Sequence, residues 1–340
     1  MPTISRRRFL ETSGALAFTL PTILGAEPIS SIFKVAVISD EISSDFDHAC
    51  SVIANDFGLQ WVELRTMWAK NLINIDEAGL ALAETILNKY KLRVTDIASP
   101  LFKTDYPGAP QSKYGPRGRV ASDTHGSATT FKEQDELLEK SIALAHRFKT
   151  DRIRCFDFWR LDDPAPYREA INAKLLEAAT RAGKDNLILV LENEFECNTA
   201  TGREAATTLA AVQSPHLMLN WDPGNAVARG ETDAFPAGFD LLPKNRIGHC
   251  HVKGAIYKQA GTFEWTPVGK GQPDWAAQFK ALKKAGYRGS VSLETHWTGG
   301  GSPEASTRIS WAGMSEALEK SGTASPSPVK GDWPKVDITG

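Results

Sequence analysis

Short apolar runs alternate with longer amphipathic stretches eight times between residues 33 and 320, and this repeat constrains the fold more than any other feature. The alternation predicts βα units around a parallel sheet, because strands buried on both faces read as continuous apolar runs. The predicted strands are Phe33–Ser39, Trp61–Leu64, Arg93–Ala98, Arg152–Phe156, Leu187–Leu191, Leu217–Asn220, Ile247–Val252 and Ser290–Leu293. The predicted helices cover residues 45–57, 76–91, 131–148, 166–183, 202–212, 234–242, 274–285 and 303–319.

Eight such units favour a closed barrel over an open doubly wound sheet. The sequence has no GxGxxG turn of the kind that marks the nucleotide-binding switch point of an open sheet. A chain of 340 residues, 41% hydrophobic and 24% charged, is compatible with one globular barrel domain. We therefore predict an α/β fold, a single-domain (β/α)8 TIM barrel over residues 33–320, with a flexible tail over residues 321–340.

The first 26 residues have the pattern of an export signal. Paired arginines in Ser5–Leu10 precede an apolar stretch at Ala15–Leu24, and the small residues Gly25 and Ala26 follow. A transmembrane anchor is the weaker alternative, because the apolar stretch is only about half of the roughly 20 residues that cross a bilayer. The segment resembles a twin-arginine signal peptide. We expect cleavage near Ala26, a periplasmic or otherwise exported protein, and no stable membrane anchor afterwards.

The composition limits the classes of partner. A formal net charge of -2 without a basic stripe argues against a nucleic-acid partner. The four cysteines lack CxxC spacing, so we expect buried free thiols, with a disulfide or a zinc site as the alternative. The sequence does not fix the oligomeric state and leaves a homo-oligomer open.

Four potential metal ligands stand at the ends of the last four predicted strands. They are Glu192, Asp222, His251 and Glu294. Barrel enzymes place reactive groups where each strand ends and its loop begins, so these four side chains can converge on one point. Each residue alone could be a helix cap or a salt-bridge partner, but the four together favour a functional site.

Three carboxylates that share a small cavity would repel one another unless a cation neutralised them. The quartet therefore predicts a bound divalent metal ion. Three carboxylates and one imidazole form an oxygen-rich set, which favours Mn²⁺ or Mg²⁺ and leaves Co²⁺, Fe²⁺ or Zn²⁺ possible. A structural zinc site is disfavoured because no cysteine belongs to the set.

The motifs around these residues resemble those of the sugar phosphate isomerase/epimerase superfamily, which has a xylose-isomerase-like barrel and includes D-tagatose 3-epimerase and inosose dehydratase branches. The resemblance covers about residues 33–320. Its motifs are Leu191–Asn193, Asp222–Asn225, His251–Lys253, Val268–Trp275 and Gly289–Glu294. In this order and spacing they are typical of the superfamily, but not of one reaction.

The resemblance implies that the quartet ligates the metal and that Glu192 and Glu294 are also the catalytic acid–base pair. In such a mechanism the metal holds a ketose carbonyl and the neighbouring hydroxyl, and the two carboxylates move a proton through an enediolate. Two residues depart from the pattern of many relatives: Asn225 replaces a histidine, and Gly254 replaces an aspartate. These departures argue against transferring the substrate specificity of the free-ketose epimerases.

Further polar and aromatic residues near the strand ends are candidates for binding a sugar. His249 should face the same side of its strand as His251, and either ligates the metal or hydrogen bonds behind it. The other candidates could instead pack against one another at the mouth of the barrel or hold neighbouring carboxylates in place. The candidate substrate-binding residues are Glu63, Arg65, Asp157, Trp159, Asn225, His249, Lys253 and His296.

These observations predict a metal-dependent isomerase or epimerase of a small carbohydrate. No phosphate-cradling glycine loop is evident, so an unphosphorylated sugar or cyclitol derivative is the preferred substrate. A dehydratase, which would expel a hydroxyl group from the same intermediate, and a sugar-binding barrel without turnover are the alternatives. An endonuclease with a multi-zinc cluster is disfavoured by the seven histidines and the near-neutral charge.

Overall fold

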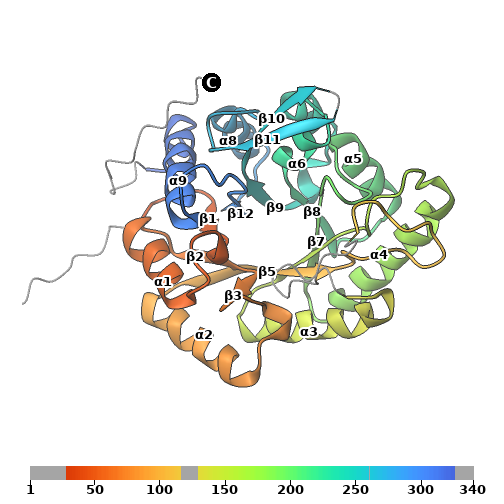
Figure 1. Cartoon of the computed structure of the whole chain (residues 1–340), viewed down its shortest axis with the longest axis horizontal. Coiled ribbons are helices and arrows are strands. Elements are labelled where there is room, and N and C mark those ends of the chain that lie inside the picture. Colours follow the sequence, from red (N-terminus) through yellow and green to blue (C-terminus); the bar gives the residue numbers. More distant parts are fainter. Residues whose placement is uncertain (1–27, 116–128, 260, 326–340) are drawn as a thin grey trace, which may run out of the picture.

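A computed structural model describes residues 28–115, 129–259 and 261–325 of the chain. Eight parallel strands form its central sheet, and helices surround them as a ring (Figure 1). The strands are β1 (Lys34–Val37), β2 (Trp61–Leu64), β5 (Arg93–Leu101), β6 (Arg152–Cys155), β7 (Ile188–Glu192), β8 (Leu217–Trp221), β9 (Ile247–Val252) and β12 (Ser290–Leu293).

The sheet closes almost completely into a barrel. Its strand order is β1-β12-β9-β8-β7-β6-β5-β2, with each neighbouring pair parallel. The two end strands meet through a parallel bridge between Ile38 and Glu63. This arrangement confirms the predicted single-domain (β/α)8 TIM barrel.

The helices follow the strands as βα units. They are α1 (Phe46–Ser51), α2 (Glu77–Tyr90), α3 (Gln134–Arg147), α4 (Arg168–Gly183), α5 (Gly202–Ala211), α6 (Pro223–Ala228), α7 (Phe239–Leu241), α8 (Trp275–Lys284) and α9 (Pro303–Lys320). Short 3-10 segments are η1 (Ser39–Glu41), η3 (Leu72–Asn74), η4 (Phe131–Glu133), η5 (Ala165–Tyr167) and η7 (Lys244–Arg246), and π segments are η2 (Val52–Asp56) and η6 (Ala234–Gly238).

The helix predicted over residues 234–242 is wrong in detail. Phe235 has an extended backbone, with φ -137° and ψ 128°, so the segment divides into η6 and the short α7. A separate helix, α6, begins directly after Asp222, whose side chain accepts a hydrogen bond from the backbone N–H of Asn225. The site residue Asp222 therefore also caps a helix.

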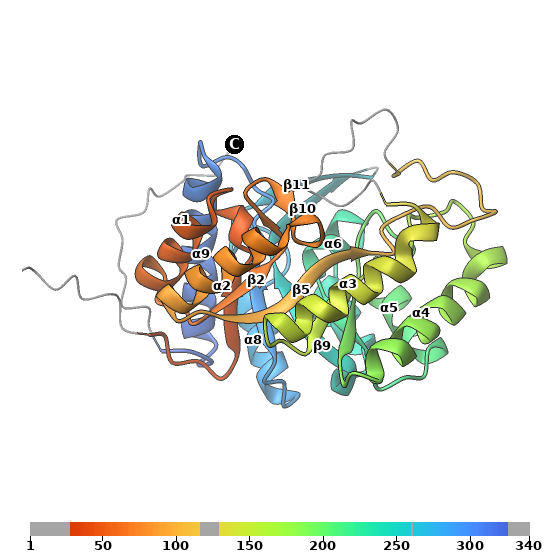
Figure 2. The ribbon, with the colours of Figure 1, turned by 90° about the horizontal axis from the view of Figure 1, so that it is seen from below.

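Two β-hairpins that the sequence reading did not predict extend the loops of the barrel. The first, β3 (Thr66–Met67) with β4 (Lys70–Asn71), follows β2. The second, β10 (Gly254–Gln259) with β11 (Thr262–Thr266), follows β9 and lies at one end of the barrel (Figure 2). Each lies at the end of the strands that carries the candidate ligands.

The ends of the described chain lie against each other. The Ile32 N–H donates to the Thr323 carbonyl at 3.0 Å, and the Ser325 N–H donates to the Ser30 carbonyl at 2.8 Å. Residues 321–325, the start of the predicted tail, are thereby paired. The predicted signal segment, residues 1–26, and residues 326–340 lie outside the described residues.

Two further expectations concern the described residues. The four cysteines, Cys50, Cys155, Cys197 and Cys250, are buried and free, which confirms the prediction of unpaired thiols. None of the helices in the described ranges is both long and apolar enough to span a bilayer.

Candidate metal centre

The four predicted ligands meet at one end of the barrel. Glu192 is the last residue of β7, His251 lies within β9, and Asp222 and Glu294 directly follow β8 and β12. Each offers one ligand atom, and these atoms all lie within 4.8 Å of one another. All four side chains are buried. We call this group the quartet.

The imidazole of His251 lies at the centre of the quartet. Its Nδ1 atom is 3.2 Å from Glu192 Oε1, 3.1 Å from Glu294 Oε2 and 3.9 Å from Asp222 Oδ2. One ring nitrogen therefore faces all three carboxylates. A nitrogen in this position can coordinate a cation when its lone pair is free.

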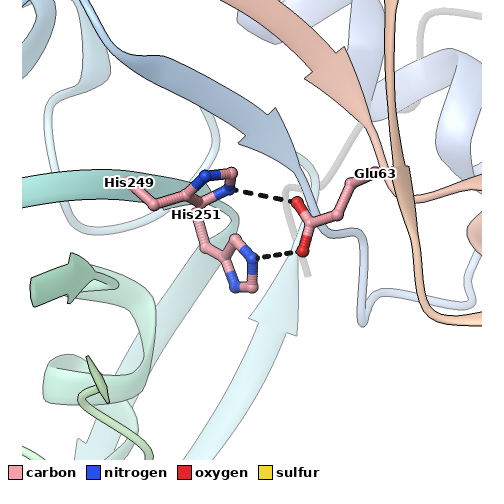
Figure 3. Close-up of side chains that lie close together, drawn as sticks. All are labelled: Glu63, His249 and His251. Atoms are coloured by element: carbon pink, nitrogen blue, oxygen red, sulfur yellow. Dashed lines mark hydrogen bonds and ion pairs between the residues drawn. The ribbon is translucent and has the colours of Figure 1, made fainter. Parts of the chain in front are cut away.

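Glu63 of β2 contacts the other ring nitrogen of the same histidine (Figure 3). Its Oε1 is 2.9 Å from His251 Nε2, and its Oε2 is 3.1 Å from His249 Nε2. When His251 Nε2–H donates a hydrogen bond to Glu63, the Nδ1 lone pair is free and points at the quartet. Glu63 and His249 are fully buried and lie behind His251, so Glu63 orients the imidazole.

Each glutamate of the quartet is also held by an arginine. The Arg154 guanidinium lies 3.1 Å from Glu192 Oε2, and the Arg65 guanidinium lies 2.7 Å from Glu294 Oε1. In both glutamates the arginine contacts the oxygen that does not face His251. These pairs restrict how the two carboxylates can rotate and leave one oxygen of each directed at the quartet.

Lys253 brings a positive charge to the other side of the quartet. Its Nζ atom is 2.8 Å from Asp222 Oδ2 and 2.5 Å from Glu294 Oε2. The lysine stem passes over Gly224, where a Cβ would collide with Lys253 Cγ. The indole N–H of Trp275 donates to the Lys253 carbonyl at 2.9 Å. The glycine of the Asp222–Asn225 turn and the tryptophan of α8 thus position the lysine.

Two asparagines fix the backbone and carboxylates around Asp222. Asn225 Nδ2 donates to Glu192 Oε1 at 3.1 Å, and its backbone N–H donates to Asp222 Oδ1 at 2.9 Å. Asn193 accepts from the Asp222 N–H at 2.7 Å and donates to the Asp222 carbonyl at 2.7 Å. Asn225, the departure from the family pattern, therefore holds two members of the quartet.

The charges around the quartet do not balance. The cations that contact it are Arg65, Arg154 and Lys253. The carboxylates in the connected network are those of Asp40, Glu41, Glu63, Asp96, Glu192, Asp222 and Glu294. Buried negative charges without partners are costly, so the network has the electrostatics of a cation site.

The pKa values reflect this excess of negative charge. Burial, opposed by Lys253 and reinforced by the nearby Glu192 and Glu294, raises the pKa of Asp222 to about 7. Burial would also raise the pKa of Glu192, but His251 and Arg154 hold it at about 2. Burial would lower the pKa of His251, yet the surrounding carboxylates raise it well above its usual value. A cation could replace the protons that Asp222 and His251 retain.

The donor atoms of the quartet suit a divalent ion. Asp222 Oδ2 and Glu294 Oε2 are buried, and the Lys253 ammonium lies 2.8 Å and 2.5 Å from them. Both atoms face His251 Nδ1, and both are hard oxygen donors. Hard carboxylate oxygens that already gather around positive charge in a buried site are the donors that a divalent cation would use.

The remaining predicted residues lie in different surroundings. Asp157 is buried, accepts from Thr199 Oγ1 at 2.6 Å and pairs with Arg168 at 2.8 Å, so it fixes the loop after β6. Trp159 is buried beside Phe156 and Cys197. His296 is one-third exposed, and its Nε2 is 3.6 Å from Glu294 Oε1. Of these residues only His296 contacts the quartet.

Several members of this charged network were not predicted from the sequence. Arg154 and Asp96 point into the barrel from within β6 and β5, while Asp40 and Glu41 follow β1 and bind Arg65 at 2.9 Å and 2.6 Å. Asp40 and Glu41 lie just after a strand, which is the same feature that identified the quartet in the sequence. A charged residue inside a buried strand was the signal for Arg154 and Asp96.

Comparison with known proteins agrees with this architecture. Residues 52–316 match the family model described as "Xylose isomerase-like TIM barrel". The protein named "Putative L-ribulose-5-phosphate 3-epimerase SgbU" of Escherichia coli (strain K12) is 28% identical over 171 residues, which are 48% of this chain and 57% of that relative. The alignment thus spans little more than half of the relative's length.

Two solved structures share the fold at low identity. The IOLI protein with a zinc atom has a TM-score of 0.65 and 14% identity, and the match covers 85% of this chain and 99% of that chain. The "probable 3-DHS dehydratase AsbF" from Bacillus anthracis has a TM-score of 0.59 and 20% identity, with coverage of 84% and 99%.

Proposed function

Because this chain belongs to the xylose isomerase-like TIM barrel family, we propose that it is a divalent-metal-dependent epimerase or isomerase of a sugar or keto-sugar. The observation that carries the proposal is the quartet, in which two arginine-held glutamates both contact His251 Nδ1. The Escherichia coli relative is named as a putative 3-epimerase, which supports this reaction class.

The two glutamates suit proton transfer. Both keep one oxygen directed at the space around His251 Nδ1, and interactions with neighbouring cations hold the pKa of both low against the effect of burial. They are therefore ionised near neutral pH and able to accept a proton. Glu192 would remove a proton from the carbon beside a carbonyl, and Glu294, after taking up a proton from solvent, would return it from the other side.

The quartet would hold the metal, with Mn²⁺ or Mg²⁺ preferred because three of its four ligands are carboxylates. A divalent ion bound there would supply Lewis-acid polarisation of a carbonyl and its neighbouring hydroxyl. Lys253 and Arg65 would keep Asp222 and Glu294 in place during the reaction.

An unphosphorylated substrate is part of the proposal. The cations beside the quartet are each bound by carboxylates: Arg65 by three, Lys253 by two and Arg154 by one. A phosphate group would have to displace these partners at the cost of exposing buried carboxylates. Within the described residues, the surroundings of the quartet favour a neutral carbohydrate.

Turnover in heavy water tests the proposal. Purified enzyme with Mn²⁺ and a panel of ketoses and inososes should incorporate deuterium at the carbon that changes configuration, because the proton equilibrates with a carboxylate. Turnover without deuterium incorporation would rule out this mechanism. A product 18 mass units lighter than the substrate would instead identify a dehydratase, the activity for which the AsbF protein is named.

We also propose export by the twin-arginine route, on the basis of the paired Arg6 and Arg7 and the apolar segment that follows. Residues 1–30 fused to a reporter should direct it to the periplasm. The double substitution Arg6→Lys with Arg7→Lys should retain the reporter in the cytoplasm, since that route reads the arginine pair. Unchanged export of the double variant would contradict the assignment.

A further inference from the structure

A strip of aromatic rings lies beside the quartet and has no role in the proposed reaction. Ring centroids are 5.0 Å apart for His296 and Trp265, 4.9 Å for Trp265 and Phe263, and 5.2 Å for Phe263 and Phe195. All four side chains are partly exposed. Grouped, partly exposed aromatic rings beside a polar site are typical of ligand-binding surfaces.

One end of the strip touches the quartet. Lys253 Nζ lies 5.4 Å from the centroid of the Trp265 ring and 2.5 Å from Glu294 Oε2. His296, which packs against Trp265, has its Nε2 atom 3.6 Å from Glu294 Oε1. His296 and Trp265 are therefore the strip residues nearest the quartet, and Phe263 and Phe195 continue the strip through their contacts with Trp265.

The hairpin that carries Phe263 and Trp265 depends on a residue that departs from the family pattern. Gly254 is the first residue of β10 and pairs with Thr266 at the end of β11. A Cβ at Gly254 would lie 2.6 Å from the carbonyl oxygens of Thr266 and Pro267. An aspartate at this position would not fit, so the glycine permits the hairpin and the aromatic strip together.

The alternation along β11 shows which face carries the rings. Thr262 and Glu264 are exposed, whereas Phe263 and Trp265 are partly buried and both contact Phe195. Phe195 follows Glu192 by three residues in the loop after β7. The strip is thus built from the three segments that follow β7, β9 and β12, the strands at whose ends Glu192, His251 and Glu294 lie.

We propose that the strip is a subsite for a second ring of the substrate. The substrate would then be a glycoside of a keto-sugar, with the carbonyl-bearing sugar unit at the quartet and a pyranose or aryl ring packed on Trp265 and Phe263. This inference rests on the proposed function, because it places the first sugar unit at the quartet. Aromatic side chains stack on planar apolar faces, which both kinds of ring present.

Matched glycosides test the subsite. We would measure binding of methyl and phenyl β-glycosides of glucose, galactose and mannose, and of the corresponding glucosyl disaccharide cellobiose, to the full-length Mn²⁺-loaded protein by calorimetry. In at least one sugar series, the ligand with a second ring should bind about tenfold more tightly than the methyl glycoside. Tighter binding of the phenyl glycoside than of cellobiose would show that the strip binds an aryl ring, and the reverse order would show that it binds a pyranose ring.

Two variants and a control complete the test. Trp265→Ala and Trp265→Leu should each reduce this preference to about twofold or less, because the stacking surface is lost. Trp61→Ala is the matched control: Trp61 is a partly exposed tryptophan at the start of β2 whose ring packs against Arg93, and its loss should not change the preference.

Three results would overturn the subsite: no ligand binds, methyl and ringed ligands bind equally, or the preference survives both Trp265 variants. A different result would contradict the proposed metal-dependent reaction. If EDTA treatment leaves all affinities unchanged while Trp265→Ala abolishes the preference, the aromatic subsite stands and the metal-dependent reaction does not.

Discussion

Replacing Glu294 by Gln should lower kcat by about 10²- to 10⁴-fold while the protein stays folded and binds metal. Gln keeps an oxygen at the position that faces His251 but cannot accept a proton, so the loss would report proton transfer. Glu192→Gln should have an effect of the same order, because epimerisation uses a carboxylate on each side of the carbon. The rate would be measured at saturating Mn²⁺ to separate chemistry from metal affinity.

The control for this prediction is Glu264→Gln. Glu264 is exposed on β11 and pairs with the surface residue Lys258, so its substitution should leave kcat unchanged. If Glu294→Gln retains more than about a tenth of the wild-type kcat at saturating metal, Glu294 is not a catalytic base or acid. Full activity of both variants would favour a role in binding for the two glutamates.

Replacing Glu63 by Ala should weaken Mn²⁺ affinity by about 10- to 100-fold, although Glu63 would not touch the ion. Glu63 accepts from His251 Nε2 and so directs the Nδ1 lone pair at the quartet. Glu63→Gln keeps an acceptor oxygen and should recover much of the affinity. Titration of the metal-free variants by calorimetry would measure both effects.

Asp96→Asn provides the matched control for Glu63. Asp96 is buried in the same barrel interior and lies 3.8 Å from His249 Nε2, but it does not contact His251. Its substitution should therefore change Mn²⁺ affinity much less than Glu63→Ala does. Equal losses in both variants would show that any missing interior carboxylate weakens the site, and would remove the specific role of Glu63.

The barrel and the quartet could be predicted from the sequence because both follow from simple periodicities. Buried parallel strands read as apolar runs, and the carboxyl ends of those strands share one end of a barrel. Each member of the quartet stands at such an end, so their positions relative to the predicted strands were enough to predict that they lie close together.

Other features could not be predicted because they depend on contacts across the barrel. Glu63 was interpreted as a residue that contacts substrate, whereas the structure places it behind His251, between strands that are not neighbours in the sheet. Arg154 stands out as a charged residue in a predicted strand, but the sequence does not show that its guanidinium contacts Glu192. The β10–β11 hairpin alternates over only five residues on β11, which is too short to distinguish from a loop.

The central claim is that the quartet binds one divalent ion, and metal titration tests it most directly. Full-length protein would be stripped with EDTA and titrated with Mn²⁺ by calorimetry, alongside an Asp222→Ala, His251→Ala double variant checked for a native circular dichroism spectrum. We predict one high-affinity Mn²⁺ per wild-type chain and none per variant chain. Absence of binding to the wild-type protein, or equally tight binding to the variant, would contradict the claim.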